Sequence, residues 1–135
     1  MEYLVGLVLA IVVSIFATVV GLDRDRAFYP TVMIVIALLY DLFAVMGGSN
    51  QALTNELIIS LGFILVATLG FKKNLWLVVG ALAGHGIYDF FHVYLFSTPG
   101  VPTFWPTFCS AYDVVAAGYL AWLLKSAKLT ARSTW

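Results

Sequence analysis

Five long apolar stretches make lipid the natural solvent for most of this chain of 135 residues. Hydrophobic residues make up 62% of the sequence and charged residues only 10%, whereas soluble domains carry about 25% charged residues. Each stretch has roughly the 20 residues that a helix needs to cross a hydrocarbon core of about 30 Å. The stretches are Tyr3–Leu22, Phe28–Gly47, Leu53–Phe71, Leu75–Phe96 and Pro106–Lys125.

Backbone groups in lipid must find hydrogen-bond partners within their own segment, so we expect all five stretches to be helices. The connections between them are short, and short connections place consecutive helices side by side and antiparallel. The sequence therefore predicts an all-α integral membrane protein with one transmembrane domain, residues 1–135, built as an up-and-down bundle of five transmembrane helices. The first stretch lacks a basic leader and is too long for a cleaved signal, so we expect it to be retained.

Basic residues predict the orientation of the bundle, because cytoplasmic loops are enriched in lysine and arginine. All seven lie at the first connection, at the third connection or near the C-terminus: Arg24, Arg26, Lys72, Lys73, Lys125, Lys128 and Arg132. This pattern predicts a multi-pass protein of the inner (plasma) membrane, with its N-terminus outside and its C-terminus cytoplasmic. The net charge of zero and the lack of a basic stripe give no support for binding nucleic acid.

Six ionisable side chains lie inside or at the edge of the apolar stretches, with no lysine or arginine beside them. An ionised carboxylate in hydrocarbon costs several kcal/mol, so such groups must be protonated, hydrated or bound to a cation. They are therefore the best guide to function. The six are Asp41, Glu56, His85, Asp89, His92 and Asp113.

The spacing of these residues predicts that several of them meet. His85, Asp89 and His92 follow one another at i, i+4 and i+7, which places them on one helix face within an arc of about 60°. At 1.5 Å per residue from the outer helix ends, Asp41, Asp89 and Asp113 all lie about 9–12 Å deep. Three carboxylates from three helices are thus expected at one level, with one histidine above them and the other below.

Imidazoles and carboxylates in a dry pocket are typical ligands of zinc, iron(II), manganese and copper(II). We predict a transition-metal site drawn from His85, Asp89, His92 and Asp113, in which one ion takes Asp89 and one histidine. Asp113 and Asp41 complete the ligand shell, and the other histidine supports it. As catalytic residues we predict Asp41, His85 and Asp113. Residues expected to contact substrate or to support the ligands are Glu56, Cys109 and Trp105.

Other interpretations of the same residues remain open. The acids and histidines can satisfy one another, through an Asp89–His85 bond and an Asp41–Asp113 pair that shares a proton, or form a metal-free proton site. Glu56 either faces headgroup water or turns inward with Ser60.

For other side chains near the acids, a purely structural role is an alternative to a role in the site. Cys109 is either a thiolate ligand or a small apolar residue. Trp105 belongs either to an aromatic belt or to a lid formed by the outer loop. Three tyrosines next to the acids in sequence are expected to point away from them and pack: Tyr40, Tyr88 and Tyr112.

Small residues indicate where helices pack closely. Gly80 and Gly84 form a G-x-x-x-G pattern, which lets a neighbouring backbone approach. A row of small residues in the first stretch, from Ala10 to Gly21, is a candidate partner, and a homo-oligomer through Gly80 and Gly84 is the alternative.

The segment His85–Asp113 resembles an uncharacterised family of small multi-pass bacterial membrane proteins. The likeness lies in an H-x-x-x-D-x-x-H helix, a Pro-rich outer loop (Pro99–Pro106) and a helix that starts Pro106-Thr-Phe-Cys109 and carries Asp113. It implies no assigned activity. A looser similarity to membrane hydrolases of the alkaline-ceramidase and adiponectin-receptor type implies zinc, but those proteins use three histidines and this chain has two.

The leading functional hypothesis is a metal-dependent membrane enzyme, a hydrolase or an oxidoreductase, that acts on a lipid or lipid-soluble substrate. The alternatives are a metal-ion or proton-coupled transporter and a structural membrane subunit with a self-satisfied polar core. The sequence leaves open whether the chain is an enzyme at all.

Overall fold

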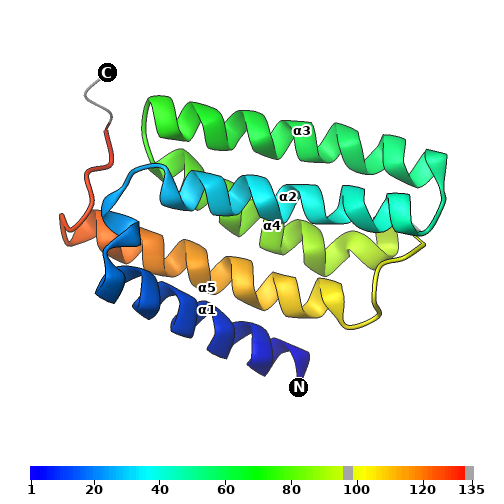
Figure 1. The fold of residues 1–135 in the computed structure, drawn as a ribbon, viewed down its shortest axis with the longest axis horizontal. Helices are drawn as coiled ribbons and strands as arrows, with labels where there is room; N and C mark the ends of the chain where they lie inside the picture. Colours follow the sequence, from blue (N-terminus) through cyan, green and yellow to red (C-terminus); the bar gives the residue numbers. More distant parts are fainter. Residues whose placement is uncertain (96–98, 133–135) are drawn as a thin grey trace.

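The structure, a computed structural model, describes residues 1–95 and 99–132. These residues form five α-helices, as predicted, in an elongated all-α bundle (Figure 1). A short 3₁₀ turn, η1 (Leu22–Arg24), follows the first helix. The helices are α1 (Glu2–Val20), α2 (Phe28–Met46), α3 (Asn50–Lys72), α4 (Trp76–Leu95) and α5 (Trp105–Lys125).

Two helix ends differ from the predicted bounds because of capping groups. Helix α3 begins at Asn50 rather than at Leu53, since the Ser49 hydroxyl accepts a hydrogen bond from the Ala52 amide and caps the helix. Helix α1 ends at Val20, where Gly21 adopts a left-handed conformation with φ of 95°. The predicted end of the fourth stretch, at residue 96, lies outside the described residues.

Four helices of the described chain are long and apolar enough to cross a membrane, namely α1, α2, α3 and α5. Helix α4 has 20 residues but is not among them. It carries His85, Asp89 and His92, whose polarity lowers its hydropathy. The four apolar helices indicate a membrane protein.

Helix α4 packs between α3 and α5, α1 covers α5, and α2 contacts α3 and α4 (Figure 1). The buried face of α1 consists of small residues and lies against α5, so the predicted packing of this face on Gly80 and Gly84 is wrong. A methyl group added at Gly80 would have no neighbour within 4 Å in the described chain. Association of two copies through Gly80 and Gly84 stays a prediction.

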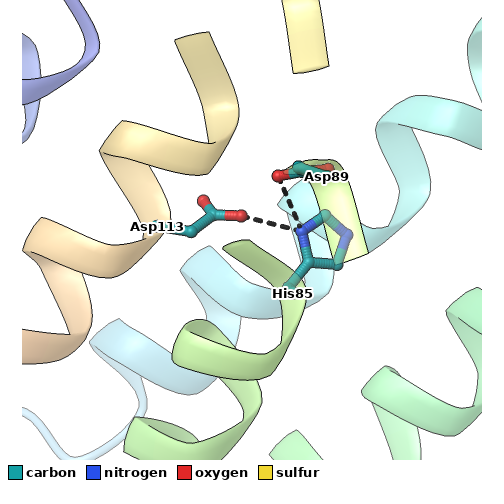
Figure 2. Close-up of side chains that lie close together, drawn as sticks. All are labelled: His85, Asp89 and Asp113. Atoms are coloured by element: carbon teal, nitrogen blue, oxygen red, sulfur yellow. Dashed lines mark hydrogen bonds and ion pairs between the residues drawn. The ribbon is translucent and has the colours of Figure 1, made fainter. Parts of the chain in front are cut away.

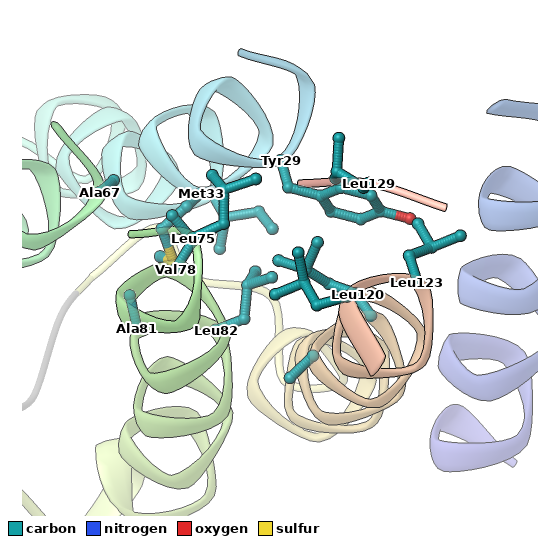
Figure 3. Close-up of a cluster of buried hydrophobic side chains, with 14 of the residues drawn as sticks. Tyr29, Met33, Ala67, Leu75, Val78, Ala81, Leu82, Leu120, Leu123 and Leu129 are labelled. Carbon is teal, nitrogen blue, oxygen red and sulfur yellow. The ribbon is translucent and has the colours of Figure 1, made fainter. Parts of the chain in front are cut away.

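An apolar cluster fills one end of the bundle (Figure 3). Arg26 donates hydrogen bonds at this end to the carbonyl groups of Phe71, Thr130 and Ala131, which ties the first loop to the end of α3 and to the C-terminal segment. The buried acids and histidines of α3, α4 and α5 lie beyond the cluster toward the other end. Central members of the cluster are Tyr29, Met33, Leu75, Val78, Leu82, Leu120, Leu123 and Leu129.

The close approach of α1 to α5 predicts a specific sensitivity at Gly6. A methyl group there would stand 2.3 Å from the carbonyl oxygen of Phe108, so Gly6→Ala must push the helices apart. We expect Gly6→Ala to lower the free energy of unfolding by about 1–3 kcal/mol, measured by thermal unfolding in detergent. The matched control is Gly118→Ala, where the added methyl group meets nothing within 4 Å and should raise stability by roughly 0.5–1 kcal/mol. Equal effects of the two changes would contradict the packing of α1 on α5.

Candidate metal centre

Three ionisable residues converge in the interior between α4 and α5, and all three are almost fully buried. His85 is 2% exposed, and Asp89 and Asp113 are 0% exposed. Their ligand atoms lie within 4.8 Å of one another, which identifies the three as a group able to hold a metal ion.

A small residue next to His85 lets the two helices approach. A methyl group added at Gly86 would stand 2.8 Å from the Val114 side chain and 3.1 Å from the Ser110 carbonyl oxygen. The Ser110 hydroxyl also donates a 2.9 Å hydrogen bond to the carbonyl group of Gly86. This contact sets α5 against α4 one turn from Asp113, and so brings Asp113 to His85.

Both carboxylates face the same imidazole nitrogen (Figure 2). The Nδ1 atom of His85 lies 2.7 Å from Asp113 Oδ2, a hydrogen-bond distance, and 3.3 Å from Asp89 Oδ2. One nitrogen carries one proton at most, so it satisfies one carboxylate well. Both oxygens of Asp89 and Oδ1 of Asp113 lack a hydrogen-bond partner among the described residues.

The buried Tyr40 hydroxyl interacts with Asp89 and is a second donor beside His85. Two donors for four carboxylate oxygens still leave more acceptors than donors in a dry interior. Buried polar atoms are normally paired, and unpaired ones are costly. A cation would satisfy these oxygens. In tetrahedral coordination at the usual zinc distances, ligand atoms stand about 3.3 Å apart, as His85 Nδ1 and Asp89 Oδ2 already do. Asp113 would need to move outward by a fraction of an ångström.

His92, a predicted metal ligand, lies in a second cluster. Its Nε2 atom is 2.8 Å from Glu56 Oε1, and the hydroxyl group of Tyr88 donates to both oxygens of Glu56, at 3.1 and 3.3 Å. Glu56 is 2% exposed, so the alternative in which it faces headgroup water is wrong. The ring of Tyr40 stacks on that of His92, with centroids 4.1 Å apart.

Asp41, a predicted catalytic residue, is buried on α2 and accepts a 2.7 Å hydrogen bond from Ser60 of α3. Asp113 instead bonds to His85. The structure therefore does not show the Asp41–Asp113 pair that the self-satisfied alternative assumed. Of the three carboxylates expected at one level, it brings together Asp89 and Asp113.

Cys109 is 5% exposed and stands outside the group of three, among apolar side chains. Trp105, the first residue of α5, packs edge-on against Phe43 at 5.0 Å between ring centroids and lies 5.6 Å from the ring of Phe108. Both residues line an apolar groove that also reaches Asp113.

Two cavities lead toward the group from different sides. A pocket of about 500 Å³ is the more polar of the two, although apolar residues such as Val93, Val101 and Pro102 also line it. This polar pocket contains Thr103 and Thr107 and reaches Asp89 and His92. A groove of about 550 Å³, lined almost wholly by apolar side chains of α1, α2 and α5, reaches Asp113. The group thus stands between a polar and an apolar cavity.

The expectation that the tyrosines only pack elsewhere missed Tyr40 and Tyr88. Tyr88 follows His85 by three residues and precedes His92 by four, a spacing that places all three on neighbouring positions of one helix face. That spacing was the available signal. The contacts of Tyr40 with the histidines depend on how α2 packs against α4, which no pattern within α2 encodes. Tyr112 lines the apolar groove.

Comparison of the chain with protein-family models, curated proteins and solved structures finds no match. The resemblance of His85–Asp113 to a bacterial membrane family stays an expectation.

The second cluster predicts strong coupling between Glu56 and His92. A hydrogen-bonded buried pair should show a coupling of about 1–3 kcal/mol in a double-mutant cycle. We expect Glu56→Gln and His92→Gln to be strongly non-additive in thermal unfolding. As a control, Glu56→Gln combined with Asp23→Asn, a buried acid at the opposite end of the bundle, should be additive within roughly 0.5 kcal/mol. Additive effects of Glu56→Gln and His92→Gln would show that the two side chains do not interact.

Proposed function

We propose that this chain is a metal-dependent membrane enzyme whose site is formed by His85, Asp89 and Asp113. The observation that carries the proposal is that two buried carboxylates meet at one imidazole nitrogen, and three of their four oxygens make no hydrogen bond among the described residues. Acids of this kind inside a membrane protein normally serve a function, because their burial is costly. The ion is a divalent transition metal, and the substrate is a lipid or lipid-soluble molecule.

We further propose that all five helices span the membrane as an up-and-down bundle, with the N-terminus outside and the C-terminus cytoplasmic. The hydrogen bonds of Arg26 support this orientation, because they hold the first loop, the end of α3 and the C-terminal segment together. The basic residues of these segments then gather at one end of the bundle, as the rule for cytoplasmic loops requires.

Access to the site favours an enzyme over a transporter. The polar pocket reaches Asp89 and His92 from the end of the bundle where α5 begins, and water can enter there. The apolar cluster fills the interior at the other end (Figure 3). Ion pathways need polar groups along their length, whereas the fully buried members of this cluster include Met33, Val78, Leu82 and Leu120.

The residues of such a site have different proposed roles. A bound divalent ion supplies Lewis acidity, which polarises a carbonyl group and activates water. The proposed ligands His85, Asp89 and Asp113 bind and orient the ion. His92 and Glu56 are hydrogen-bonded through Nε2 and Oε1, and His92 lines the polar pocket. Asp41, whose Oδ1 atom is buried without a hydrogen-bond partner among the described residues, is the further acid that we propose for proton transfer.

A structural role is the second candidate, and one observation favours it. The 2.7 Å contact of His85 with Asp113 is a good hydrogen bond without any ion, and such a bond between α4 and α5 would by itself fix how these helices pack. The metal content of the protein distinguishes the two candidates.

The test is elemental analysis of purified protein, with thermal unfolding before and after addition of zinc, iron(II), manganese or copper(II). We expect one ion per chain and a rise in melting temperature on reloading after chelation. His85→Gln, Asp89→Asn and Asp113→Asn should each lower metal affinity at least tenfold, an effect that even neighbours of ligands produce. His92→Gln is the matched control, since it changes a histidine of the same helix, and should retain the ion. If the wild-type protein contains no metal and its melting temperature does not change when metal is added, the metal site is excluded and the structural role is the remaining candidate.

A further inference from the structure

The apolar groove is bounded by α1 on one side and α2 on the other, and the first half of α5 lines the part of it near Trp105. Its lining includes Leu9 and Val13 of α1, Val32 and Val35 of α2, and Phe108 and Tyr112 of α5. Leu9 is 40% exposed and Val35 53% exposed, so the groove is open along its rim. All three helices are long and apolar enough to cross a membrane, and the groove therefore opens toward hydrocarbon.

The dimensions of the groove limit what fits in it. Its walls run from Leu9 on α1 to Leu22 in η1, and from Ala27, just before α2, to Leu39, which is about 18–20 Å at 1.5 Å per residue. The part lined by α5 begins at Trp105, which packs against Phe43 of α2, and so extends the groove to roughly 24 Å. A volume of about 550 Å³ over these lengths corresponds to a mean cross-section of roughly 20–30 Å².

This cross-section excludes a helix and admits a hydrocarbon chain. An α-helix with its side chains is about 10–12 Å wide, or roughly 80–110 Å² in section, so a helix of a second copy would not enter. Carbon atoms in contact stand about 4 Å apart, which gives an extended hydrocarbon chain a section of roughly 13–16 Å². The groove is thus wide enough for one such chain.

A polar feature marks one place along this apolar path. Asp113 lines the groove, is 0% exposed, and its Oδ1 atom has no hydrogen-bond partner among the described residues. Its Oδ2 atom is bonded to His85 in the proposed metal site. A molecule lying in the groove therefore passes directly beside that site.

We propose that the groove between α1 and α2 binds a single hydrocarbon chain of a membrane lipid and lays it beside Asp113. The inference rests on the proposed function, because it names the substrate class as a lipid that presents a position along its chain to the site. The polar pocket reaches Asp89 and the groove reaches Asp113, so water and lipid approach the two carboxylates of the site from different cavities.

Photo-crosslinking in nanodiscs tests the proposal, with a phosphatidylcholine that carries a diazirine in its acyl chain as the probe. We expect at least fivefold more crosslinks per residue at Val13 and Tyr112, mapped by mass spectrometry, than on the exposed apolar face of α3 at Ile58, Leu61 and Leu65. Even labelling of all lipid-facing surfaces would overturn the proposal. Protection of the groove in a crosslinked dimer would also overturn it, since a second copy would then be the occupant.

Groove-filling variants provide the second arm. Val13→Trp and Val35→Trp should each reduce groove crosslinking at least fivefold. The matched controls Val12→Trp and Leu38→Trp change exposed neighbours on the same helices that do not line the groove, and they should leave the crosslinking unchanged. Val35→Phe replaces Val35→Trp if that variant fails to fold. An equal loss in groove variants and controls would contradict the proposal.

Metal content measured on the same samples separates the two claims. Groove labelling in a wild-type protein that binds no metal would remove the proposed enzyme activity and keep the lipid site. A metal-loaded protein with even labelling would remove the lipid site and keep the metal centre. Val13→Trp should retain its metal, because Val13 is not a ligand.

Discussion

Two carboxylates, Asp89 and Asp113, face one imidazole nitrogen of His85 in the dry interior of the bundle. The proposed metal site depends on this shortage of hydrogen-bond donors. One proton on Nδ1 serves one carboxylate, and the Tyr40 hydroxyl near Asp89 is the further donor. The oxygens that remain make no hydrogen bond among the described residues. Two neighbouring acids in low dielectric avoid ionising together unless a cation lies between them. The same geometry that makes the site costly without an ion makes it suitable for one.

The rest of the bundle supports this group. Gly86 lets α5 approach α4, and the bond from Ser110 to the Gly86 carbonyl group fixes that approach. The second cluster stands beside the first, and the ring of Tyr40 connects them, since it stacks on His92 and lies 6.2 Å from the ring of His85. The apolar cluster at the opposite end closes the interior there. The two clusters of acids and histidines thus lie toward one end of the bundle, and a mainly apolar core lies toward the other, where Asp23 is a buried acid bonded to Thr18.

Sequence patterns predicted what depends on a single helix. Hydropathy predicted five helices, and the i, i+4 spacing of His85 and Asp89 predicted that they share a face. The predicted depth of Asp113 along its helix matched that of Asp89, and the two residues meet in the structure. Patterns within one helix say less about partners on another helix. Whether His92 turns to Glu56 or to the metal group, and whether Asp41 meets Asp113 or Ser60, depends on how α2, α3 and α5 are rotated about their axes. The packing of α1 was also mispredicted, because small residues show that a helix approaches closely without showing which helix it approaches.

The groove could not be predicted from the sequence for the same reason. Its lining residues are ordinary apolar residues of membrane helices, and no spacing distinguishes them from residues that face lipid. The groove exists because α1 and α2 both stand against other helices and leave a narrow space over α5. Two routes to one group of ligands, one polar and one apolar, are a property of the packed bundle that the sequence does not display.

X-ray absorption spectroscopy of the metal-loaded protein tests the central claim most directly, because it reports the ligand atoms around the ion. We predict one imidazole nitrogen and otherwise only oxygen ligands, at metal–ligand distances of about 2.0–2.2 Å if the ion is zinc. Two imidazoles would place His92 in the site, and a sulfur at about 2.3 Å would place Cys109 there. Either result would contradict a centre formed by His85, Asp89 and Asp113.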